Sequence, residues 1–68
     1  MNTYMVIVFD ANPDHSVTKV VFDSSPEDAL RRVLNAAPCM AVELEEVVDG
    51  KILMMRCNNE THIVHRMH

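Results

Sequence analysis

The residues best suited to chemistry in this sequence are soft metal ligands. They are three histidines, one methionine and two cysteines, namely His62, His65, His68, Met67, Cys39 and Cys57. Imidazole, thioether and thiolate groups bind zinc and copper. If residues 61–67 form a strand, however, His62 and His68 share a face and His65 points the other way. We therefore expect no metal site, and a small metal-binding module remains an alternative function.

The sequence also gives little support to catalysis. Cys39 follows Pro38 at the end of a predicted helix, where the negative end of the helix dipole disfavours a thiolate. Gly50 is the only glycine, so a glycine-rich phosphate loop is excluded. Glu43 and Glu45 have the residue types of a glycosidase acid pair, but a domain of 68 residues offers no deep cleft. We expect a protein that is not an enzyme and needs no cofactor.

Length and charge limit the function classes further. The 68 residues form one domain, 1–68, with a marginal core, since a domain of this size buries about 60% of its unfolded surface. Ten acidic against six basic residues give a net charge of −4, which disfavours non-specific binding to nucleic acid or to anionic membranes. A basic protein partner is compatible with this charge. With no signal peptide and no long apolar run, we expect a cytoplasmic protein with reduced thiols.

A single helix organises the predicted fold. Ser25 is a good N-cap and Pro26 suits the first helical position, while Leu30 and its neighbours Val33 and Leu34 form an apolar stripe. Pro38 disfavours helical geometry in the residue before it, so the helix is expected over Ser25 to Ala37. Two i,i+4 ion pairs are expected on its outer side, Glu27 with Arg31 and Asp28 with Arg32.

Strand patterns surround this helix. Apolar or alternating stretches predict strands over residues 3–9, 17–22, 40–48, 51–57 and 61–67, with a turn at 12–14 and a hairpin at Asp49-Gly50. The first strand is apolar enough to be central, and the polar alternation of the last suits a sheet edge. The sequence therefore predicts an α+β fold with one helix on a mostly antiparallel sheet, in the order ββαβββ.

Two surfaces are candidates for binding a partner. The first strand is apolar on both sides, so one side, expected to be that of Tyr4 and Val6, is left open for a protein partner or a second copy. The other candidate is acidic, with Glu43 and Glu45 on one face of a strand and Asp49 at the adjoining turn. Such a patch suits the lysines and arginines of a nucleic-acid-binding protein.

The arrangement of elements resembles one known group of proteins. The passage from Ala29 to Val48, the Asp49-Gly50 hairpin and the short last strand are similar to the single-helix, five-strand layout of small phage-encoded anti-CRISPR proteins. This resemblance covers most of the chain as a pattern of elements. It implies a stoichiometric inhibitor in the host cytoplasm, whose acidic surface occupies a basic nucleic-acid channel of its target without catalysis. A self-associating structural subunit is a further alternative.

Overall fold

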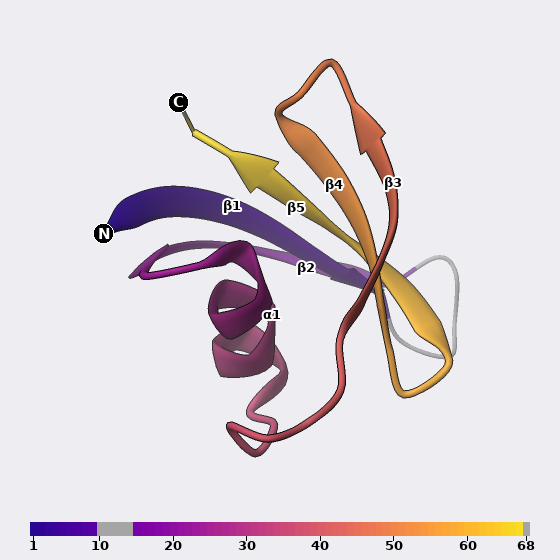
Figure 1. Cartoon of the computed structure of the whole chain (residues 1–68). Helices are drawn as coiled ribbons and strands as arrows, with labels where there is room; N and C mark the ends of the chain where they lie inside the picture. The colour runs from indigo at the N-terminus through magenta and orange to yellow at the C-terminus, as the bar shows by residue number, and fades with distance from the viewer. Residues whose placement is uncertain (10–14, 68) are drawn as a thin grey trace.

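The computed structural model describes residues 1–9 and 15–67, and it contains one helix and five strands (Figure 1). In chain order the elements are β1 (Asn2–Phe9), β2 (Ser16–Asp23), α1 (Pro26–Leu34), β3 (Glu43–Val48), β4 (Ile52–Cys57) and β5 (Glu60–Arg66). The strands form one antiparallel sheet, and α1 packs against one face of it. The predicted α+β class and ββαβββ order are confirmed. The predicted turn at 12–14 and His68 lie outside the described residues.

The strand order in the sheet is β2-β1-β5-β4-β3. β1 has a neighbour on each side, as its apolar sequence predicted. The prediction that the last strand lies at an edge is wrong, because β5 pairs with β1 on one side and β4 on the other. Its polar residues are accommodated inside the sheet: His62 is buried and accepts a hydrogen bond, and Val64 between the histidines is fully buried.

The helix begins as predicted and ends earlier. The hydroxyl of Ser25 accepts a hydrogen bond of 3.1 Å from the backbone N–H of Asp28, and Pro26 occupies the first helical position. The helix ends at Leu34 because Asn35 adopts the left-handed conformation, with φ of 56°. The N–H of Ala36 then donates to the carbonyl of Arg31. Extension to Ala37 was therefore wrong, since a left-handed cap stops the helix before Pro38 acts.

The ion pairs of the helix also differ from those predicted. Arg31 contacts Asp28 at 2.9 Å, one residue closer in sequence than the expected partner. Arg32 pairs with a residue outside the helix. Its Nε donates a hydrogen bond of 2.6 Å to the Oδ2 atom of Asp23. The hydrogen bond from Arg32, assisted by the N–H of Ser24, lowers the pKa of the buried Asp23 carboxyl below its ordinary value. The pair ties the helix to the last residue of β2.

The core lies between α1 and one face of the sheet. Its buried apolar side chains are Tyr4, Val6, Ala29, Leu30, Leu53, Met55, Cys57 and Val64. The prediction that Tyr4 and Val6 lie on the open face is wrong, since they are 1% and 0% exposed. Both belong to the same buried cluster as Leu30 of the helix. The alternation along β1 was correct, but its direction relative to the helix was reversed.

Candidate protein-binding face

The sheet face opposite α1 is largely apolar, and we call it the open face. Because side chains alternate along a strand, Met5, Ile7 and Phe9 point away from the helix that covers Tyr4 and Val6. The cross-strand register adds further apolar residues on this side, namely Val20, Phe22, Val48, Ile52, Met54 and Ile63. Val20 and Phe22 are 63% and 60% exposed. The expected partly apolar open face is therefore confirmed, with a different set of residues from β1.

The register arranges this face in rows that cross all five strands. Directly opposed residues in an antiparallel pair point to the same face, so each row is a chain of neighbours. The first row, which we call the His65 row, runs Val20, Met5, His65, Ile52, Val48. The next, the Ile63 row, runs Thr18, Ile7, Ile63, Met54, Glu46. The third, the Thr61 row, has Ser16 opposite Phe9, which lies two residues beyond Ile7 on β1, and Thr61, Arg56 and Glu43 opposed on β5, β4 and β3. Polarity therefore rises toward one corner of the sheet.

That corner carries three glutamates, Glu43, Glu45 and Glu46, which we call the acidic border. They share one face because the pairing of β3 with β4 shifts between Leu44 and Glu46, as at a β-bulge. Glu43 lies opposite Arg56, and Glu46 lies opposite Met54, both on the open face. A carboxylate oxygen of Glu45 accepts a hydrogen bond of 2.5 Å from the Thr61 hydroxyl and lies 3.4 Å from Nε of Arg56.

The structure brings together only part of the predicted acidic patch. Glu43 and Glu45 lie on one side of the sheet, as expected from their i,i+2 spacing. Asp49 lies beyond the opposite end of β3, in a turn where its φ is 54°, and about 13 Å of extended strand separates it from Glu45. Glu46 takes the third position instead. The sequence signal for this was the interruption that Glu46 makes in the apolar alternation of this strand, which is what an inserted residue produces.

The bulge also exchanges the faces of the two valines that follow it. Uninterrupted alternation along the strand predicted over residues 40–48 places Val48 on the same side as Leu44, and Val47 on the side of Glu43 and Glu45. In the structure Val47 pairs with the buried Leu53, and Val48 pairs with Ile52 on the open face. The predicted faces were therefore wrong for these residues, because one extra residue inverts every later side chain of a strand.

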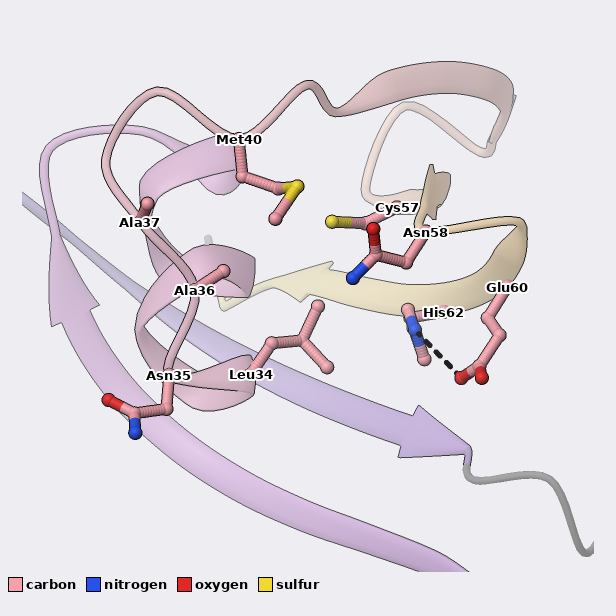
Figure 2. A pocket seen from close by; sticks show the side chains of 9 residues that line it. All are labelled: Leu34, Asn35, Ala36, Ala37, Met40, Cys57, Asn58, Glu60 and His62. Atoms are coloured by element: carbon pink, nitrogen blue, oxygen red, sulfur yellow. Dashed lines mark ion pairs between the residues drawn. The ribbon is translucent and has the colours of Figure 1, made fainter.

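The other side of the sheet contains a pocket of about 320 Å³ beside the C-terminal end of α1 (Figure 2). Its lining comes from the last residue of α1, the chain after it, β4, β5 and the turn between these strands. It consists of Leu34, Asn35, Ala36, Ala37, Met40, Cys57, Asn58, Glu60 and His62. In Figure 2 the sulfur atoms of Met40 and Cys57 point toward one another. This pocket holds most of the residue types that first suggested metal binding.

Hydrogen bonding at His62 decides what the pocket can do chemically. Nδ1 of His62 accepts a hydrogen bond of 3.1 Å from the backbone N–H of Phe9, so in the neutral ring the proton sits on Nε2. Nε2 lies 3.8 Å from a carboxylate oxygen of Glu60. Burial is the main cause that lowers the pKa of His62, partly offset by the negative charge of Glu60. The ring is therefore held neutral, with Nε2 protonated.

This arrangement disfavours both a metal ligand and a catalytic base at His62. A ligating histidine normally donates a hydrogen bond from its second nitrogen, whereas Nδ1 here is an acceptor and Nε2 carries a proton. The same proton prevents Nε2 from accepting one from the Cys57 thiol. His65 points to the opposite side of the sheet. Within residues 1–9 and 15–67, no three His, Cys, Asp or Glu side chains gather to hold a metal ion.

The chain has no match among protein-family models, curated proteins or solved structures. In the described ranges, no helix has the length and apolar character needed to cross a membrane. The resemblance to anti-CRISPR proteins therefore stays a hypothesis about element layout.

Proposed function

We propose that this protein is a non-enzymatic binding module whose open face contacts another protein. The observation that carries the proposal is the continuous apolar surface of the His65 and Ile63 rows, which α1 leaves uncovered. An apolar sheet face of this extent on a small domain is typical of a protein interface. An apolar centre with a charged rim is also the usual anatomy of such interfaces.

The acidic border indicates the chemistry of a heterologous partner. The border carries three carboxylates, and the guanidinium of Arg56, opposite Glu43 and close to Glu45, offsets part of their charge. An excess of negative charge beside an apolar centre suits a partner that carries lysines or arginines around an apolar patch. Surfaces that bind nucleic acid have this character. Occupying such a surface would inhibit the partner without any reaction, as the resemblance to anti-CRISPR proteins implies.

The test is capture of partners from the source cell with a tagged protein and two matched variants. Met54→Asp places a charge in the Ile63 row, and Val17→Asp makes the same kind of change at a residue that is 53% exposed on the helix side of β2. We expect Met54→Asp to weaken capture by about tenfold or more and Val17→Asp to leave it unchanged. Equal capture by both variants would contradict the proposal.

A second pair of variants tests the role of the acidic border. Replacing Glu43 and Glu45 by lysine should slow association with a basic partner and reduce its dependence on salt, because electrostatic steering mainly affects the association rate. Surface plasmon resonance at two ionic strengths measures both effects. Unchanged salt dependence would show that the apolar rows alone hold the partner.

A further inference from the structure

We propose that the protein that covers the open face is a second copy of this chain, packed face to face about a two-fold axis that runs along β5. This inference rests on the proposed function, since it assigns the apolar rows of the same surface to a second copy and leaves the acidic border at the rim of the dimer for a basic partner. Three features support it: the area of the face, the distribution of polar and apolar residues across the rows, and the absence of like-charge contacts among the described residues of the three rows.

The open face has the area that a stable pair needs. Five strands about 4.8 Å apart span about 24 Å, and the rows extend about 20 Å along the strands, giving about 500 Å² on each copy. Two copies together bury about 1,000 Å² in projection, which is the lower end for a specific interface. A weak, concentration-dependent dimer is therefore expected, and a domain with a marginal core gains from it.

The order of the rows fits a two-fold axis along the central strand. Such an axis reverses the strand order, so β2 faces β3 of the second copy and β1 faces β4. In the His65 row, Val20 then meets Val48 of the second copy, and Met5 meets Ile52. Every contact beside the axis in this row is apolar. Two twisted sheets packed in this aligned manner form the usual core of a β-sandwich.

The other two rows match in the same arrangement. In the Ile63 row, Ile7 meets Met54 of the second copy, and Glu46 meets Thr18, whose hydroxyl can donate to the carboxylate. In the Thr61 row, Arg56 faces Phe9 of the second copy, and a guanidinium facing an aromatic ring favours a cation–π contact. The acidic border falls at the rim of the dimer, where its carboxylates keep access to water.

The alternative two-fold axis, across the strands at the Ile63 row, gives mismatched contacts. It would place Glu46 opposite Glu46 of the second copy, and Val48 opposite Glu43. Like charges in direct opposition repel, and a valine against a carboxylate desolvates the charge without a partner. The two axes also differ at one residue that can be tested. His65 faces itself when the axis runs along β5, and it faces Thr61 when the axis crosses the strands.

The experiment measures the mass of the intact chain by sedimentation velocity over a range of concentrations. The wild type should be a dimer at high concentration. His65→Asp and His65→Lys should each be monomeric alone, because each places like charges on the axis. Mixing the two variants should restore the dimer, because an Asp then faces a Lys. Val17→Asp, on the helix side, should dimerise like the wild type. Circular dichroism of every variant checks that the fold is kept.

Each outcome decides the inference. A wild type that stays monomeric at millimolar concentration overturns it, as does a dimer that survives both His65 variants or a mixture that stays monomeric. If either His65 variant fails to fold, Met54→Asp, which faces Ile7 of the second copy, gives the same decision through loss of the dimer. The proposed function is judged separately: a monomeric wild type whose capture of another protein is lost in Met54→Asp keeps that function and overturns only the second copy as partner.

Discussion

The imidazole of His62 accepts a hydrogen bond from the backbone N–H of Phe9, across 3.1 Å and between residues 53 positions apart in the chain. The bond joins the start of β5 to the end of β1. It requires a neutral ring, because a protonated Nδ1 donates and cannot accept. A histidine that is 1% exposed therefore connects the stability of the sheet to pH.

The first prediction follows from this bond. Burial keeps the pKa of His62 in the folded protein below its ordinary value of about 6.5. As the pH falls below about 6.5, the unfolded chain takes up a proton at His62 before the folded chain does, so the free energy of unfolding decreases. The contribution of the neutral His62 to stability is fully present above about pH 6.5. Melting temperatures measured from pH 8 down to pH 5 should therefore decrease as the pH is lowered.

His62→Gln provides the control for that prediction. The carboxamide oxygen of glutamine can accept the N–H of Phe9, and it does not titrate in this range. The melting temperature of this variant should depend less on pH between 7 and 5 than that of the wild type. An identical slope would assign the pH dependence to another group.

The second prediction concerns the contact of the helix with the sheet. Leu30 is fully buried in the core cluster with Tyr4 and Val6. Leu30→Ala should lower the free energy of unfolding by about 2–5 kcal/mol, through lost burial and the cavity that remains. Chemical denaturation measures this change. Val17→Ala, at an exposed position on the same side of the sheet, should change it by less than about 0.5 kcal/mol.

The third prediction concerns the end of the helix. Asn35 has φ of 56°, a conformation that glycine adopts without strain and that β-branched residues avoid. Asn35→Gly should keep or raise the melting temperature, whereas Asn35→Val should lower stability by about 1–2 kcal/mol. Equal melting temperatures for the two variants would show that the helix does not depend on this cap.

The fourth prediction concerns the pair of Arg32 and Asp23. The hydrogen bond from Arg32 holds the pKa of Asp23 below its ordinary value, so the pair stabilises the fold above that value, and the contribution is lost as the pH falls through the lowered pKa. Arg32→Gln should raise the pKa of Asp23. NMR titration of the Asp23 carboxyl carbon measures it. Arg31→Gln, which removes a contact with Asp28, is the control and should leave the pKa of Asp23 unchanged.

The sequence predicted the elements well where the signals were local. Ser25 and Pro26 act within one turn, so the start of the helix was found from sequence. The end of the helix was predicted wrongly because both Asn35 and Pro38 can end a helix, and the sequence alone does not show which of them does. The two faces of β1 were separated correctly, but a strand that is apolar on both sides does not show which side the helix covers.

Features that depend on distant parts of the chain were not predictable in the same way. The hairpin of β3 and β4 was visible in Asp49-Gly50, whereas the central place of β5 depends on its pairing with β1. Two members of the acidic border, Glu43 and Glu45, were predicted to lie together because they follow simple alternation along the strand. Glu46 joined it only through a bulge, and a bulge is defined by the partner strand.

The central position of β5 has a consequence for the order of folding. β1, β2 and α1 contact one another, and β3 and β4 form a hairpin, but β5 is the strand that pairs with both groups. Until β5 is in place, each group has an unpaired edge and exposed apolar side chains, the condition in which partly folded chains aggregate. Docking of residues 60–66 is therefore expected to be the step that completes the sheet and removes this risk.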